Sequence, residues 1–334
     1  MSYDANVLRR ANQRLEDQNR RRRDQAERLR QDVYARQPKL EQLDRRIQGT
    51  MAGLVAAALR QGGDPVQAVR SVREENQSLQ RERAALLADM GLAEDSLDGK
   101  PACPLCRDSG WQGGRMCRCL QQLCAQEQIK ELSKLLDLGE QSFDTFSMDY
   151  YSPSPDPQHG ISPRENMDMN CSVCWNYATK FGRTSTKNLL LSGPPGLGKT
   201  FLSACIARTV SENGFSVVYD TSVNVFEQFE TRRFRRDSAD GLDARDETRR
   251  YLSCDLLILD DLGREMTTRL TQSSLYELVN TRLVAGRQTV ISTNLSLEEL
   301  EQRYDPPILS RLKGEYEFLG FFGADIRPLR KNQL

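Results

Sequence analysis

The stretch "NLLLSGPPGLGKTFLSACIARTV", residues 188–210, decides the fold of this 334-residue chain. It begins with an apolar run, passes through a glycine-rich loop and ends in a segment suited to a helix. The loop, residues 193–200, matches G-x-x-x-x-G-K-[ST] at every fixed position, and this phosphate-binding motif requires the order strand, loop, helix. A glycine-rich turn that matches by chance is the alternative. We therefore predict a nucleotide site at this loop.

The residue types of the loop suit contact with phosphates. Its glycines let backbone N–H groups and the positive N-terminus of the helix approach the anion closely. Lys199 is expected to reach the β- and γ-phosphates, and Thr200 to offer its hydroxyl to Mg²⁺. The predicted contacts to ATP are Gly193, Pro194, Pro195, Gly196, Leu197, Gly198, Lys199, Thr200 and Phe201.

Strand-like and helix-like segments alternate from residue 188 onwards. The strand-like runs are "NLLLS" (188–192), "FSVVYD" (215–220), "DLLILDDLG" (255–263), "TVISTN" (289–294) and "YEFLGFF" (316–322). Because helices are expected between most of them, this alternation predicts an α/β fold, a parallel sheet with helices on its faces.

The third strand-like run carries two carboxylates near its end, Asp260 and Asp261, after four apolar residues. A buried strand that delivers carboxylates to its C-terminal end places them where Mg²⁺ needs them, so Asp260 is expected to hold the ion through water. Asp261 is then placed to polarise the attacking water. The alternative is a pair of carboxylates that merely caps a strand end. Asn294 ends the next strand, where taken alone it could be an ordinary turn residue.

Four cysteines lie in "CPLCRDSGWQGGRMCRC": Cys103, Cys106, Cys117 and Cys119. Two close pairs joined by a loop suit tetrahedral Zn²⁺, and four thiolates leave no open position for chemistry. The second pair is tighter than the usual C-x₂-C, and Cys124 is close enough in the sequence to compete as the fourth ligand. Buried thiols without a metal are the other alternative.

The sequence divides into four predicted regions. Residues 1–92 are rich in charged residues, Leu and Ala, and they are expected to form helices, including a coiled-coil hairpin. Residues 93–140 hold the zinc module and a connecting helix, residues 141–187 an irregular linker and a lead-in helix, and residues 188–334 the ATPase core. The run Arg20 to Arg23 is either a solvated helix face or a contact to a phosphate backbone.

Composition limits the remaining function classes. The 47 basic side chains equal the 47 acidic ones, so net charge gives no argument for a nucleic-acid partner. The chain has no apolar run long enough to cross a membrane and no apolar signal-peptide core, so we expect a soluble, cytoplasmic protein without a membrane contact.

The motifs together resemble AAA+ ATPases, and within them the DnaC/DnaI group of replicative helicase loaders and the related IstB transposition ATPases. The resemblance covers residues 143–330 and rests on "GPPGLGKT", "LLILDDLG", "ISTNL", "ILSRL" and "GADIR". It implies that Asn294 is a sensor 1 residue beside the γ-phosphate. It also implies that Arg311 is an arginine finger acting on ATP in the neighbouring subunit, and that Arg327 is a sensor 2-like contact. Each arginine could instead be a surface residue.

Two departures from the wider AAA+ pattern narrow the expectation. The chain ends a few residues past Arg327, so no full helical lid is expected, which resembles the loaders and IstB proteins. Asp261 stands where many AAA+ proteins have Glu, and its shorter side chain predicts slow turnover, suited to a switch. The zinc module and the helices before it resemble the front of DnaI-type loaders.

The resemblance implies a function in the initiation of DNA replication. The protein would be a homo-oligomer that holds single-stranded DNA and the replicative DNA helicase. ATP binding and slow hydrolysis would act as the switch that controls this binding. The candidate DNA contact is "TRRFRRD", in which Arg232, Arg233, Arg235 and Arg236 surround Phe234, although a salt-bridged helix face also fits. The alternatives are an IstB-like helper of a DNA transposase and an adaptor that binds nucleotide with little hydrolysis.

Overall fold

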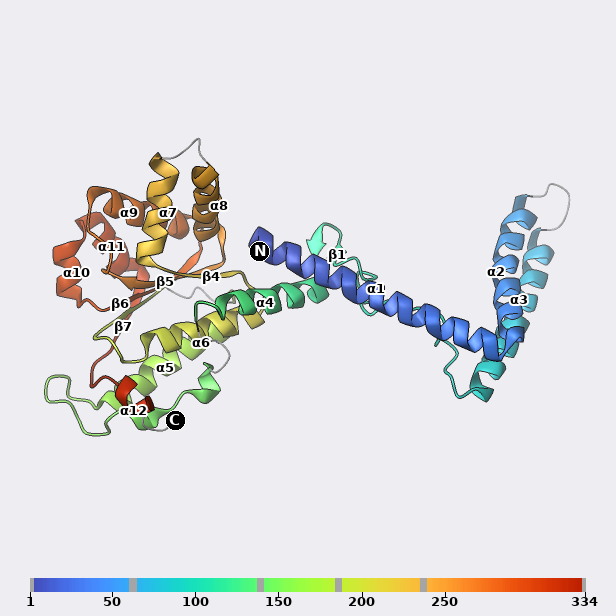
Figure 1. The fold of residues 1–334 in the computed structure, drawn as a ribbon, viewed down its shortest axis with the longest axis horizontal. Helices are drawn as coiled ribbons and strands as arrows, with labels where there is room; N and C mark the ends of the chain where they lie inside the picture. The colour runs from blue at the N-terminus through green and yellow to red at the C-terminus, as the bar shows by residue number, and fades with distance from the viewer. Residues whose placement is uncertain (1–2, 60–64, 137–140, 184–187, 235–238, 332–334) are drawn as a thin grey trace. The chain divides into compact units, whose positions relative to one another are not determined.

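The computed structural model describes residues 3–59, 65–136, 141–183, 188–234 and 239–331. The chain divides into two compact units, one of Met1–Asn12 with Arg118–Leu334 and the other of Gln13–Cys117. The first unit contains the phosphate loop, and the second contains the helices that precede the four-cysteine segment (Figure 1).

The first unit is built on a five-stranded sheet in which every pairing is parallel. Its strand order is β4-β5-β6-β3-β7. The strands are β3 (Asn188–Ser192), β4 (Val217–Thr221), β5 (Leu256–Leu262), β6 (Gln288–Thr293) and β7 (Tyr316–Gly320). The parallel sheet and all five strands predicted from the sequence are therefore confirmed.

Helices cover both faces of this sheet (Figure 1). Leu189 and Leu191 of β3 belong to the core shared with α5 and α6, whereas Leu190 belongs to the core on the other face, shared with α7 and α9. A strand buried on both faces explains the unbroken apolar run in the sequence. The larger helices of the unit are α4 (Arg118–Leu132), α5 (Pro163–Thr179), α6 (Lys199–Glu212), α7 (Ser222–Phe234), α8 (Ala239–Ser253) and α9 (Arg269–Val284).

Shorter helices complete the unit and carry several predicted site residues. They are the 3₁₀ helices η1 (Phe143–Thr145) and η2 (Met148–Tyr150), then α10 (Leu297–Arg303), α11 (Pro306–Glu315) and α12 (Arg327–Lys331). α10 begins at a capping box: Ser296 Oγ accepts the Glu299 N–H at 3.2 Å, and Glu299 accepts the Ser296 N–H at 2.7 Å. This box fixes the chain just after the end of β6.

The second unit consists of helices and a small hairpin. Its elements are α1 (Ala5–Arg36), whose first residues belong to the first unit, then α2 (Pro38–Leu59), α3 (Pro65–Asp89), β1 (Trp111–Gln112) and β2 (Arg115–Met116). α2 and α3 pack against each other, and Arg83 donates to Asp44 across them at 2.6 Å. The expected helices are present, while coiled-coil packing stays a prediction. Among the described helices, none has the length and hydropathy that a bilayer crossing needs.

Candidate functional site

The phosphate loop has a backbone that only glycine fits. Gly193 and Gly196 adopt φ values of 146° and 81°, in the region that disfavours side chains. A Cβ atom on Gly193 would lie 2.1 Å from the Phe321 carbonyl oxygen, and one on Gly196 would lie 2.0 Å from an oxygen of Asp325. The Ile326 N–H donates to the Gly196 carbonyl at 3.0 Å, so the chain after β7 packs directly against the loop.

Lys199 begins α6 and is buried beneath the loop. Its Nζ donates to the Pro194 carbonyl at 2.8 Å, to Asn294 Oδ1 at 2.9 Å and also to the Gly193 carbonyl. Burial lowers the pKa of Lys199 to about 8, although the carboxylates of Asp261 and Asp260 oppose that shift. Phosphate oxygens would replace these neutral acceptors with charged ones, so the ammonium group is positioned for an anion.

Asp260 lies buried at the end of β5 with both carboxylate oxygens engaged. Oδ2 accepts the Tyr219 hydroxyl at 2.6 Å and the Thr200 hydroxyl at 3.4 Å, and Oδ1 accepts the Ser292 hydroxyl. The structure thus brings Thr200 and Asp260 together. A hydroxyl and a carboxylate are oxygen ligands of the kind that Mg²⁺ takes, directly or through water, so these two residues would hold it.

Asp261 has a strained backbone, with a φ of 56° although it is not glycine. The pairing of β5 with β6 shifts register between Leu259 and Leu262, and such an irregularity can redirect a side chain at an active site. Asp261 Oδ1 accepts from Asn294 Nδ2 at 3.3 Å, and Oδ2 pairs with Arg264 Nη1 at 2.8 Å. Asn294 therefore connects Asp261 to Lys199.

Lys199, Thr200, Asp261 and Asn294 line a cavity of about 370 Å³. Phe146, Tyr150 and Tyr151 form one wall of the cavity together with Phe201. The first three lie in the segment that the sequence predicts to be an irregular linker. The rings of Phe146 and Phe201 meet edge to face at 5.3 Å, and the Tyr151 hydroxyl donates to the Leu197 carbonyl at 3.2 Å. No spacing motif marks these aromatic residues in the sequence. The only indication of their role is that several aromatic residues lie close together before the lead-in helix.

The two predicted arginines occupy different places. Arg327, at the start of α12, lines the cavity. Arg311 is not among the described residues that line the cavity. Its Nη2 donates to the Tyr276 hydroxyl at 3.2 Å, and its guanidinium lies 5.2 Å from the centroid of the Tyr276 ring. The structure does not bring Arg311 to the cavity of its own chain, and its role in a neighbouring subunit stays a prediction.

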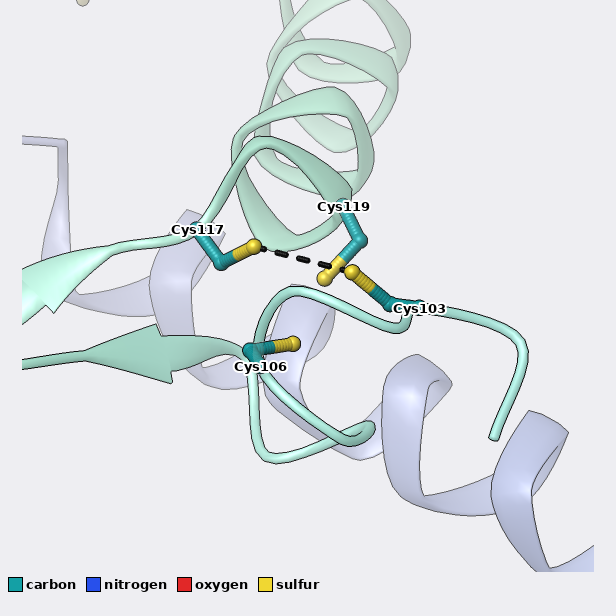
Figure 2. Close-up of side chains that lie close together, drawn as sticks. All are labelled: Cys103, Cys106, Cys117 and Cys119. Carbon is teal, nitrogen blue, oxygen red and sulfur yellow. Dashed lines mark hydrogen bonds between the residues drawn. The ribbon is translucent and has the colours of Figure 1, made fainter. Parts of the chain in front are cut away.

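The four predicted metal ligands lie together (Figure 2). The sulfur atoms of Cys103, Cys106, Cys117 and Cys119 all lie within 4.8 Å of one another. Cys103 Sγ is 3.7 Å from Cys117 Sγ, and Zn–S bonds of about 2.3 Å in a tetrahedron place sulfurs about 3.8 Å apart. The cluster fits zinc, which these four thiolates would hold.

Local hydrogen bonds shape the turn that presents the first two cysteines. Arg107 and Asp108 have φ values of 50° and 65°. Asp108 accepts the Cys103 N–H at 2.8 Å, and the Gly110 N–H donates to Cys106 Sγ at 3.3 Å. An N–H that points at sulfur favours the thiolate form that a metal needs.

Cys124 lies outside the four-sulfur group found among the described residues. It is fully buried in α4, and burial raises the pKa of its thiol to about 11. A buried, neutral thiol suits a packing role, so the group around Cys119 is the better metal site.

The basic runs are partly engaged within the chain. Arg232 pairs with Glu277 at 2.7 Å and lies 4.7 Å from the Phe229 ring centroid, whereas Phe234 is 73% exposed. Arg235 and Arg236 lie outside the described residues. In the earlier run, Arg20 pairs with Asp17 at 3.8 Å and Arg22 with Asp108 at 3.2 Å, which fits a salt-bridged helix face.

Comparisons with known proteins agree with the site. A family described as IstB-like ATP binding protein matches residues 178–312. An insertion sequence ATP-binding protein of Sinorhizobium fredii is 29% identical over 123 residues, which are 37% of this chain and 39% of that protein. The replicative helicase loader DnaC of Escherichia coli K12 is 24% identical over 163 residues, 47% of this chain and 65% of that protein.

The match to known proteins is partial. The chain spans half or less of the length of several curated relatives that it matches. Among solved structures, a crystal structure of the DnaC helicase loader aligns with a TM-score of 0.44 and 17% identity, covering 56% of this chain and 99% of that chain.

Proposed function

We propose that this protein, whose residues 178–312 match the IstB-like ATP-binding family, is an ATPase that acts as a replicative helicase loader. It binds ATP with Mg²⁺, holds single-stranded DNA and the replicative helicase, and uses slow hydrolysis as a switch in replication initiation. The observation that carries the proposal is one cavity lined by Lys199, Thr200, Asp261 and Asn294, with Asp260 bonded to Thr200.

Each of these side chains has a role in phosphoryl transfer. Lys199 moves from the loop carbonyls to the phosphates. Thr200 and Asp260 would hold Mg²⁺, which would neutralise developing charge. Asp261 accepts a hydrogen bond from the attacking water and Asn294 holds that carboxylate in place. The aromatic wall around Phe146 supplies a surface for the adenine base.

The site of a single chain is completed by a neighbour. Arg311 lies outside its own cavity, so an ATP-bound homo-oligomer brings Arg311 of one subunit to the γ-phosphate held by the next. An arginine that meets the transition-state charge only after assembly links hydrolysis to the state of the complex.

The zinc module and the helices before it are proposed to bind the helicase. The second candidate function, assistance to a DNA transposase, is favoured by the insertion-sequence relatives and by the family described above. A nucleotide-binding adaptor with little hydrolysis would bind its partners through the same surface. It would, however, show little ATP hydrolysis in a single-turnover assay.

A pull-down with the tagged full chain separates the two main candidates. We expect the purified replicative helicase of the same organism to be captured with ATP, and Lys199→Ala to lose the ATP dependence. Capture of a transposase and not of the helicase, by a chain that binds ATP normally, would favour the second candidate and reject the first.

A further inference from the structure

We propose that Arg264 is a positioning residue that responds to the γ-phosphate of ATP in its own chain. It holds Asp261 when the site contains no ATP and moves to the phosphate when ATP binds. Apart from the hydrogen bond that Asn294 donates, both oxygens of Asp261 are then open to a hydrogen bond from the attacking water. This inference rests on the proposed ATPase function and adds a residue that no sequence motif singled out.

The position of Arg264 relative to Asp261 is fixed by a tight turn after β5. Its backbone N–H donates to the Asp261 carbonyl at 3.2 Å, while its Nη1 pairs with Asp261 Oδ2 at 2.8 Å. Gly263 has a φ of 101°, and a Cβ there would lie 2.5 Å from Leu295, so the turn is packed closely against the chain after β6. The backbone is anchored and the side chain of Arg264 is the part that can move.

The residue after Arg264 anchors the same turn. The buried carboxylate of Glu265 accepts the Gly263 N–H at 2.9 Å, the Ser222 hydroxyl at 2.7 Å and the Tyr304 hydroxyl. The hydrogen bonds of Glu265 thus stabilise the turn. Asp261 is the carboxylate that Arg264 pairs with among the described residues.

The observed pair restrains the carboxylate that the reaction needs. Asn294 donates to one oxygen of Asp261 and Arg264 to the other. A guanidinium bound to Oδ2 competes with the attacking water for that oxygen. Hydrolysis therefore requires Arg264 to release Oδ2. The γ-phosphate of bound ATP causes this release because it competes with Asp261 for the guanidinium.

The pair is weak enough for ATP to break. The Arg264 side chain is 69% exposed, and an ion pair in water is easily exchanged. Arg264 also lines the same cavity as Lys199 and Arg327, and its guanidinium is bound to Asp261, another residue of that lining. A γ-phosphate offers more negative charge than one carboxylate and accepts two N–H bonds at once. ADP lacks that group and leaves the pair intact.

Affinity for ATP and ADP tests the response to the γ-phosphate. We expect Arg264→Ala to weaken ATP binding about tenfold while ADP binding changes less than about twofold. Arg264→Lys should restore part of the preference. Arg269→Ala, five residues later and not among the described residues lining the cavity, is the matched control and should change neither affinity. Equal weakening of ATP and ADP would overturn the proposal.

A double-mutant comparison tests the hold on Asp261. Asp261→Asn removes the partner of Arg264, so this variant should bind ATP more tightly than the parent. That gain should shrink when Arg264→Ala is added, because part of it depends on a released arginine. A gain of the same size in both backgrounds would mean that only the repulsion between Asp261 and phosphate was removed, and the proposal would be wrong.

These binding measurements need neither helicase nor DNA, so failure of the loader function leaves the inference standing. Failure of the parent chain to bind ATP would overturn both. Retained ADP affinity in each variant shows that it is folded.

Discussion

At the scale of single residues, the charge of Lys199 controls the binding of phosphate at the loop. Its ammonium group is buried among neutral carbonyls, and the pKa falls to about 8 for that reason. Above that pH the free protein loses the charge, whereas bound phosphates favour the protonated form. Proton uptake must therefore accompany ATP binding above about pH 8 and fade below it.

This linkage gives a measurable pH dependence. We expect ATP affinity to fall as pH rises from about 7 to about 9, and the apparent binding enthalpy above about pH 8 to depend on the ionisation enthalpy of the buffer. Calorimetry in two buffers measures both. Lys199→Ala should abolish binding, because the phosphates lose their buried cation. A constant affinity over this range would contradict the lowered pKa of Lys199.

At the scale of secondary-structure elements, the buried Arg282 joins three segments. It lies in α9, is fully buried and donates to the carbonyls of Tyr251 at 2.6 Å and Cys254 at 3.1 Å, near the end of α8. It also donates to the Gln288 carbonyl and to the Thr289 hydroxyl at the start of β6. These groups have left water and depend on the guanidinium for their hydrogen bonds.

Removal of this guanidinium should destabilise the first unit. We expect Arg282→Met to lower the free energy of unfolding by about 3 kcal/mol, because several buried carbonyls lose their donor. Urea denaturation measures the change, and Arg269→Met, at an exposed position of the same helix, is the control. A loss under about 1 kcal/mol would contradict this account of the buried arginine.

The cysteine cluster makes a prediction about metal content. Purified protein should contain about one Zn²⁺ per chain. Cys119→Ala should lose it and Cys124→Ala should retain it, because Cys124 is outside the cluster. Chelation should loosen residues 103–119 and leave ATP binding largely intact. If Cys124→Ala lost the metal and Cys119→Ala retained it, Cys124 would be the fourth ligand in place of Cys119.

The strands, the phosphate loop and the carboxylates were predictable because each depends on a short run of sequence. The bond from Tyr219 to Asp260 joins residues 41 apart, and it follows from the pairing of β4 with β5. The pairing of Asp261 with Arg264 depends on the positive φ of Asp261 in the turn after β5, and the aromatic wall at Phe146 depends on how separate segments pack. Propensity and spacing carry no information about such contacts, so the sequence could not specify them.

At the scale of the whole molecule, the proposed function requires that one chain supply only part of the hydrolytic site. The cavity holds Lys199, Asp261 and Asn294, whereas Arg311 is engaged with Tyr276 elsewhere in the first unit. Arg264 and Arg327 line the cavity from the same chain, but each is expected to bind phosphate in the ground state. The proposed switch requires a further cation that arrives only with a neighbour.

Mixing two inactive variants tests this claim most directly. Arg311→Ala and Asp261→Asn should each bind ATP and hydrolyse it poorly, because each lacks one half of a composite site. When they are mixed under conditions in which the chains associate, some interfaces join an intact Asp261 to an intact Arg311. The account predicts that ATP hydrolysis partly returns in the mixture. If associated chains stay as inactive as the separate variants, Arg311 does not act between subunits and the proposed switch is wrong.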